Sequence, residues 1–201
     1  MQKEKGNSLL YCASVCLAYA FVSVAITFVN KIVLTVYRFH FEQTLILLQL
    51  LVGTLGLLIL SELKMCQVPR FQLKMARQAF PLAFWFFVYV VTGLGSLRSL
   101  TVPTWSAMRR LTAIFILILD YFIDRRMAPT SIWLSVFMML IGAGVAALGD
   151  IDGDLAGYLH VSANCLSSAL YLRAVARIKR ATGLSEAGVL YYANLLSLPL
   201  V

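Results

Sequence analysis

Two adjacent arginines stand out because they lie inside an apolar stretch of the sequence. Arg109 and Arg110 come six and seven residues after Pro103, where an apolar segment begins. Guanidinium groups form bidentate, charge-assisted hydrogen bonds with phosphate or carboxylate, and an ionisable residue deep in an apolar segment is a functional candidate by default. The alternative is an ion pair with Asp120, but that residue is about three turns away on the same helix and could only meet a basic group of another segment. We therefore expect an anion site at Arg109 and Arg110, with Trp105 on the same helical stripe as Arg109.

Lys31 is a third cation inside an apolar segment. Helical spacing places it on one face with Asn30 and Thr27. It either contributes to a binding site or extends its aliphatic stem toward the membrane interface, and position alone does not separate these interpretations.

Two further groups of polar residues follow later in the chain. Tyr191, Tyr192 and Asn194 suit a nucleobase, by stacking and by hydrogen bonds to its edges, although interfacial tyrosines also form ordinary aromatic belts. A polar stripe with helical spacing either lines a cavity or bonds a neighbouring helix, packing being the commoner role. Its members are Asn164, Ser167, Ser168 and Tyr171.

The composition shows what must position these residues. Of 201 residues, 61% are apolar and only 26 carry a formal charge, which excludes both a soluble globular protein and a disordered chain. A membrane helix needs about 20 apolar residues. Six such segments occur, and a seventh is cut off at Val201, so we expect an all-α polytopic membrane bundle that is part of a longer protein. The expected spans, in one transmembrane domain, are about 9–36, 41–60, 80–97, 103–123, 131–149, 155–174 and the incomplete 187–201.

The basic residues are sorted by side of the membrane. Twelve of the 17 lie in the N-terminal tail or in alternate loops, two lie on the opposite side, and three lie inside spans. Because cytosolic loops are enriched in Lys and Arg, the N-terminus is expected in the cytosol. The net charge of +8 thus reflects membrane orientation and gives no reason to expect a nucleic-acid partner. The longest connection, 61–79, is expected to lie on the cytosolic membrane surface.

Small residues should let some of these segments approach each other closely, without any ligand. The candidates are Gly53, Gly56, Gly142 and Gly144. The sequence contains no metal-ligand spacing, and we expect no cofactor.

Four motifs, in order along the chain, resemble the nucleotide-sugar transporters of the drug/metabolite transporter superfamily. These are Val29-Asn30-Lys31, Thr101-Val102-Pro103 followed by Arg109-Arg110-Leu111-Thr112, Leu148-Gly149-Asp150 followed by Gly157-Tyr158, and Tyr191 to Leu200.

The resemblance implies ten helices in two inverted five-helix repeats, of which this chain holds the first repeat and the start of the second. It also implies a Golgi or endoplasmic reticulum membrane, exchange of a cytosolic nucleotide sugar for a lumenal nucleoside monophosphate, and possible homodimers. The motifs look closest to UDP-sugar and UDP-uronic acid carriers, with GDP-mannose as the alternative. The Tyr191–Asn194 segment would contact the base, and Lys31 and Arg109 the phosphates. Ala193 departs from the family pattern, which has an asparagine at this position, so one side-chain amide that could bond the base is missing.

Two other functions compete with transport. Asp152 and Asp154 form an Asp-x-Asp pair that could hold a divalent metal and a sugar nucleotide in a membrane glycosyltransferase, although the loop is short. The absence of the family's later Gly-Ala-Leu-Asn-Lys-like segment would also fit an inactive or regulatory half-transporter.

Overall fold

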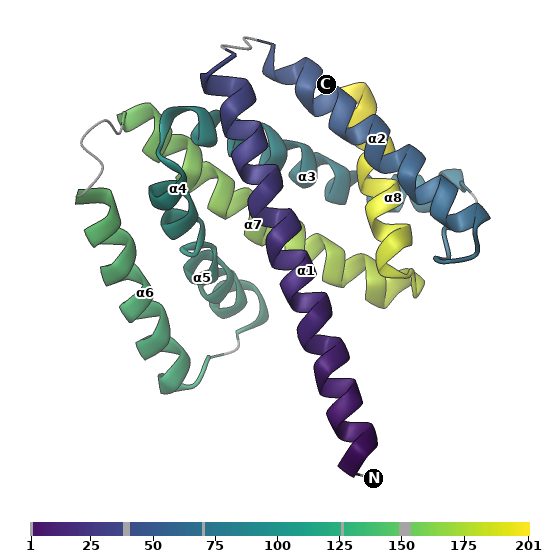
Figure 1. The fold of residues 1–201 in the computed structure, drawn as a ribbon, viewed down its shortest axis with the longest axis horizontal. Coiled ribbons are helices and arrows are strands. Elements are labelled where there is room, and N and C mark those ends of the chain that lie inside the picture. The colour runs from purple at the N-terminus through teal and green to yellow at the C-terminus, as the bar shows by residue number, and fades with distance from the viewer. Residues whose placement is uncertain (1, 38–40, 70, 126, 149–153) are drawn as a thin grey trace. The chain divides into compact units, whose positions relative to one another are not determined.

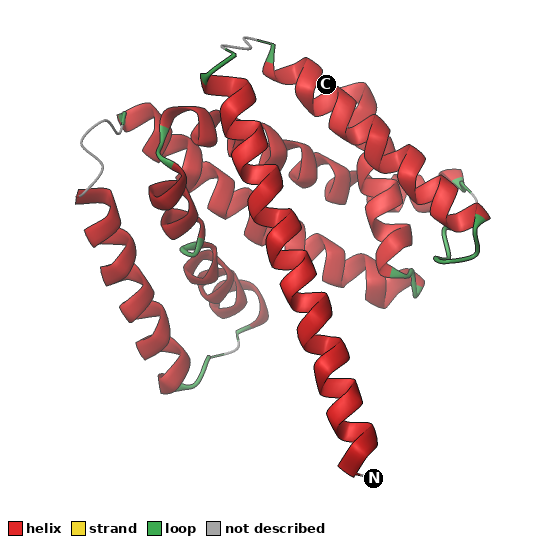
Figure 2. Ribbon diagram, viewed as in Figure 1, coloured by secondary structure: helices red, strands yellow, loops and turns green. Residues whose placement is uncertain are grey.

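The computed structural model describes residues 2–37, 41–69, 71–125, 127–148 and 154–201. Every regular element in these ranges is a helix, so the expected all-α fold class is confirmed. Figure 2 shows these helices and the short loops that join them. The chain divides into two units, Met1–His40 and Phe41–Val201, which are described separately.

The first unit is a single helix, α1 (Gln2–Thr35), which covers the first expected span. Within it, Tyr11–Thr35 is long and apolar enough to cross a membrane. The second unit begins with α2 (Glu42–Glu62) and α3 (Leu73–Ser99), and both helices also meet that criterion of length and composition.

The start of α3 differs from the expectation of a surface loop up to residue 79. The helix begins at Leu73, and its first two turns bury Ala76 and Ala79 against α8. These small residues leave room for a close helix contact, so the segment packs in the interior.

The expected span 103–123 consists of two consecutive helices, α4 (Val102–Arg109) and α5 (Thr112–Asp124). Arg110 and Leu111 join them in a tight turn, where backbone amides donate to the carbonyl three residues earlier. This is 3₁₀ geometry, which often marks a hinge or a strained segment in a longer helix.

The remaining helices are α6 (Thr130–Leu148), α7 (Leu155–Thr182) and α8 (Glu186–Ser197), followed by the 3₁₀ turn η1 (Leu198–Leu200). The Asp154 carboxylate accepts a hydrogen bond from the Ala156 amide and caps α7, which extends beyond the expected 155–174. Gly183, with a φ of 67°, ends α7 in the left-handed conformation, and the Ser185 hydroxyl caps α8.

Two buried clusters hold the second unit together, and α3 and α7 contribute to both. One joins α3, α7 and α8 and includes Leu82, Ile178 and Tyr192. The other joins α3, α4 and α7 through Leu97, Trp105 and Val161. Figure 1 shows α3 and α7 running beside each other.

Close helix contacts occur at one of the four glycines named above. A Cβ at Gly53 would come within 3.0 Å of the Asn194 amide nitrogen, whereas Gly56, Gly142 and Gly144 face open space within the described structure. The expectation is therefore confirmed for Gly53, and it stays a prediction for the other three.

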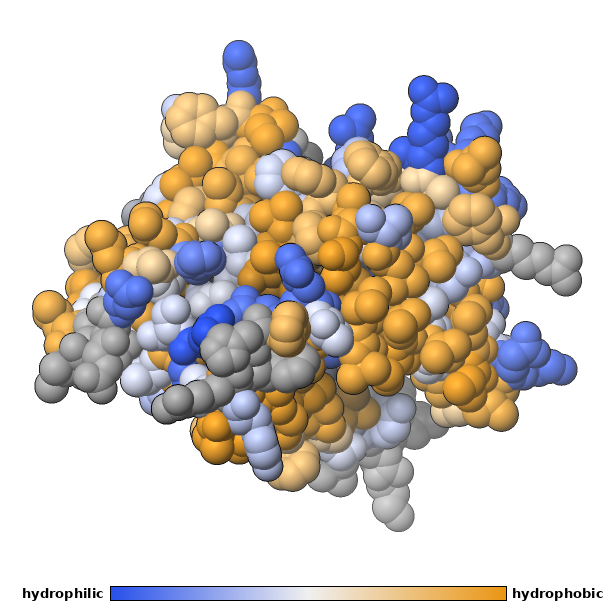
Figure 3. Space-filling model, turned by 90° about the horizontal axis from the view of Figure 1, so that it is seen from above, coloured by the Kyte–Doolittle hydropathy of each residue, from blue (hydrophilic) through white to orange (hydrophobic). Residues whose placement is uncertain are grey.

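Apolar side chains cover much of the surface, as Figure 3 shows for one face. On α6, Trp133, Leu134 and Phe137 are all more than two-fifths exposed. A surface of this kind fits the expected contact with lipid, because a soluble monomer rarely exposes so much contiguous apolar area. The individual spans and the repeat arrangement stay predictions.

Candidate functional site: an arginine held between three helices

Arg109 lies at the end of α4, immediately before the turn into α5. Its Nη2 donates a 2.7 Å hydrogen bond to the Tyr89 hydroxyl on α3. The guanidinium carbon also lies 4.7 Å from the centre of the Trp105 ring and 5.6 Å from that of Tyr89, which are cation–π distances. The guanidinium group is therefore held by two aromatic residues from two helices.

Further hydrogen bonds hold both aromatic residues in place. The Trp105 Nε1 donates to the buried Ser96 Oγ at 2.9 Å. The Asn164 side-chain amide on α7 donates to the Tyr89 backbone carbonyl at 2.6 Å. Because α3, α4 and α7 all contribute, the position of Arg109 depends on the packing of three helices.

Packing against a neighbouring helix is the commoner role for the polar stripe that contains Asn164. The hydrogen bond from its side-chain amide to the Tyr89 carbonyl on α3 confirms that role. Its side-chain oxygen, however, is buried and has no described hydrogen-bond partner. The ring of Tyr171 lies parallel to that of Tyr89, with the two centroids 6.2 Å apart.

The two arginines do not occupy equivalent environments. Arg109 is half-buried, whereas Arg110, in the 3₁₀ turn, is exposed. Successive residues of such a turn point about 120° apart, so adjacent side chains cannot converge on the partners of Arg109. A role for Arg110 in the site stays a prediction.

Asp120 pairs with another helix, as the spacing along its own helix required. Its Oδ1 lies 2.6 Å from Nη1 of Arg173, so the pair joins α5 to α7. Asp120 therefore does not neutralise Arg109, and the guanidinium can attract an anionic ligand.

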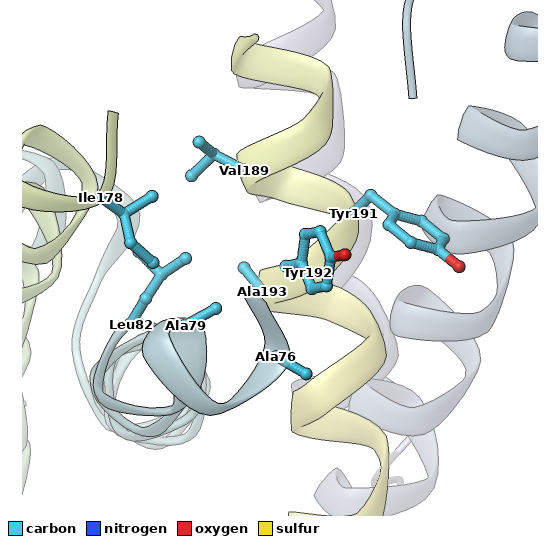
Figure 4. Close-up of a cluster of buried hydrophobic side chains, with 8 residues drawn as sticks. All are labelled: Ala76, Ala79, Leu82, Ile178, Val189, Tyr191, Tyr192 and Ala193. Atoms are coloured by element: carbon cyan, nitrogen blue, oxygen red, sulfur yellow. The ribbon is translucent and has the colours of Figure 1, made fainter. Parts of the chain in front are cut away.

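The Tyr191–Asn194 segment lies in the core formed by α2, α3 and α8. Tyr192 is fully buried, and its hydroxyl accepts a 3.0 Å hydrogen bond from the Gln72 amide at the start of α3. Figure 4 shows Tyr192 among the core side chains, while Tyr191 points away from Leu82. The structure describes no contact between this segment and Arg109, and the base-binding role stays a prediction.

Asn30 and Lys31 lie in the last two turns of α1, within the first unit. Their part in a site therefore also stays a prediction. Asp152 lies outside the described residues, and the described role of Asp154 is the helix cap.

The contact between Trp105 and Arg109 confirms the stripe expected from the sequence. Tyr89 was missed, because it follows the apolar run Trp85-Phe86-Phe87-Val88 and nothing in that run distinguishes it. The available signal was a hydroxyl in the middle of an apolar helix, where it needs a partner.

An all-helical chain with several long apolar helices and a cation held between them is typical of a membrane transporter. Residues 10–194 match the model of the Triose-phosphate Transporter family, and the chain belongs to that family. This is a family of transporters, which agrees with the resemblance found in the sequence motifs.

Similar proteins carry names that refer to nucleotide sugars. A Dictyostelium discoideum protein provisionally named a UDP-sugar transporter is 35% identical, over 84% of this chain and 44% of its own length. The UDP-galactose/UDP-glucose transporter 7 of Arabidopsis thaliana is 28% identical over 98% of this chain and 60% of its own length. The GDP-mannose transporter GONST2 of the same plant is 30% identical over 90% of this chain and 50% of its own length. The chain thus spans about half the length of these relatives.

Proposed function

We propose that the protein takes part in nucleotide-sugar transport, exchanging a cytosolic UDP-sugar for a lumenal nucleoside monophosphate across a Golgi or endoplasmic reticulum membrane. The observation that carries the proposal is Arg109, which is half-buried between aromatic rings while the nearest acidic residue of its own segment, Asp120, is paired elsewhere. Nucleotide sugars carry a diphosphate, and guanidinium groups bind phosphate oxygens in a bidentate manner.

The geometry of the arginine supports binding of phosphate in the plane of its guanidinium group. The group has five N–H donors, and the structure describes one of them as engaged, by Tyr89. The Trp105 ring covers a face of the group, whereas phosphate oxygens approach its edge. Ring contact and ligand binding can therefore occur together.

The other residues named from the sequence have roles consistent with this proposal. Lys31 and Arg110 would add positive charge toward the phosphates, with Asn30 beside Lys31. Tyr191, Tyr192 and Asn194 would contact the base in a conformation where α8 is less tightly packed, because Tyr192 and Asn194 are almost fully buried in this one. A base contact from these residues thus requires α8 to move.

The test is exchange in proteoliposomes with protein expressed from its complete reading frame. Vesicles preloaded with UMP or GMP would be given a panel of labelled UDP-sugars, UDP-glucuronic acid and GDP-mannose. Uptake of a UDP-sugar that depends on internal UMP supports the proposal. Uptake of GDP-mannose against GMP would change the assigned base, which relatives named as GDP-mannose transporters make a specific alternative. No exchange with any of these substrates would refute nucleotide-sugar transport.

A further inference from the structure

We infer that Tyr89 is a positioning residue for the substrate phosphates, acting through Arg109; the inference rests on the proposed function. It does not need to touch the ligand. Its hydroxyl fixes one nitrogen of the guanidinium group, and this determines which edge of the group is presented to a phosphate.

The first step of the argument is the cost of an unrestrained arginine. An arginine side chain loses rotamer entropy when it is immobilised. In this structure the 2.7 Å hydrogen bond to Tyr89 and the ring contact with Trp105 supply much of that restraint. A preorganised group binds more tightly because its ordering has already occurred.

The second step is that Tyr89 is itself restrained. Its backbone carbonyl accepts the short hydrogen bond from Asn164, and its ring stacks on Tyr171 with only 5° between the planes. Both partners lie on α7, whereas Arg109 lies on α4. The position of the Arg109 guanidinium group on α4 therefore depends, through the Tyr89 phenol, on how α3 and α7 pack.

The third step concerns the arginine's own backbone. The Thr112 hydroxyl donates a 2.8 Å hydrogen bond to the Arg109 carbonyl at the turn between α4 and α5. The backbone of Arg109 is fixed from α5 and its side chain from α3. Loss of the phenol oxygen should therefore release the side chain without moving the backbone.

The experiment compares Tyr89→Phe with wild type in the exchange assay. Phenylalanine keeps the ring, the stack on Tyr171 and the cation–π contact, and removes only the hydroxyl. Tyr121→Phe is the matched control, because Tyr121 is a partly exposed tyrosine on α5 whose described ring contact is with its neighbour Phe122. The measured quantities are KM and kcat for the nucleotide sugar, the inhibition constants of UMP and GMP and of uridine and guanosine, and the melting temperature.

The expected result is a rise of about tenfold in KM and in the inhibition constant of the nucleoside monophosphate, because the ligand would then have to restrict part of the arginine's rotamer freedom itself. The inhibition constant of the nucleoside and kcat should change less than about twofold. The melting temperature should change by less than about 2 °C. In an Arg109→Ala background, Tyr89→Phe should have no further effect, because the residue acts through the arginine.

Three outcomes would overturn the inference. Unchanged nucleotide inhibition in Tyr89→Phe, with wild-type exchange intact, removes Tyr89 while leaving the proposed function in place. Equal weakening of nucleoside and nucleotide would mean that Tyr89 supports the general structure of the site. Absence of nucleotide inhibition in wild type would refute the proposed function and this inference together.

If Tyr89→Phe does not fold, Trp105→Phe provides the same comparison from the other side of the arginine. It removes the bond to Ser96 and weakens the cation–π contact. The same selective loss of phosphate affinity is expected. If affinity did not change, restraint of the Arg109 guanidinium group would not matter for phosphate binding, and this would contradict the inference.

Discussion

Replacement of Arg109 by alanine should abolish most phosphate affinity while leaving the protein folded. In the described structure, the side chain makes one hydrogen bond, to Tyr89, and two ring contacts. Together these contribute about 2–3 kcal/mol to folding. A bidentate phosphate contact contributes two charge-assisted hydrogen bonds, at least about 3 kcal/mol, which corresponds to about 100-fold weaker binding when both are lost.

The assay is exchange into proteoliposomes over a range of nucleotide-sugar concentrations, together with a thermal melt of the purified variant. We expect kcat/KM to fall about 100-fold and the melting temperature to fall by a few degrees. Arg110→Ala is the matched control, because its neighbouring charge is exposed and should contribute through longer-range attraction only, about two- to fivefold.

Two results would refute this reasoning. Exchange by Arg109→Ala within about threefold of wild type, in a protein of normal melting temperature, would remove Arg109 from the site. A larger loss in Arg110→Ala than in Arg109→Ala would mean that the exposed arginine, not the one held by aromatic rings, binds the phosphates.

Three further predictions concern the packing around the site. Exchanging the charges of Asp120 and Arg173 should recover the stability lost in either single charge reversal, with a coupling of about 1 kcal/mol since both side chains are partly exposed; no recovery in melts of the double variant would contradict the pairing. Gly157→Ala should lower stability by about 1–3 kcal/mol, because its Cβ would lie 2.9 Å from the Ser99 side chain, and Gly56→Ala, in open space, should not. Tyr192→Phe should cost about 1–3 kcal/mol by removing the acceptor of the Gln72 amide, and a shift in base preference among nucleoside monophosphates, with little change in stability, would instead favour base binding.

Most of the helical regions could be predicted from the sequence because they coincide with long apolar runs. The break within 103–123 could not, since Arg110 and Leu111 are both compatible with a continuous helix. The start of α3 at Leu73 was also missed, because basic residues interrupt the apolar pattern of its first two turns. Only the burial of Ala76 against α8 explains why these turns are part of the helix.

The candidate site was predicted in part, for a related reason. Charge in an apolar segment identified Arg109, and helical spacing identified Trp105. The contact with Tyr89 depends on the packing of α3 against α4, which no local pattern encodes. Similarly, the spacing indicated that Asp120 needed a partner on another helix, but only the packing of α5 against α7 identifies Arg173.

The turn between α4 and α5 has a mechanical consequence for a carrier. When the angle between two helices joined by a turn changes, their far ends move most and the residues at the turn move least. Arg109 is the last residue before that turn, and its carbonyl is tied across it by Thr112. A phosphate bound there would lie at the fulcrum, so the helix ends on either side could tilt to open one face of the membrane or the other while the ligand's anchor stayed nearly still.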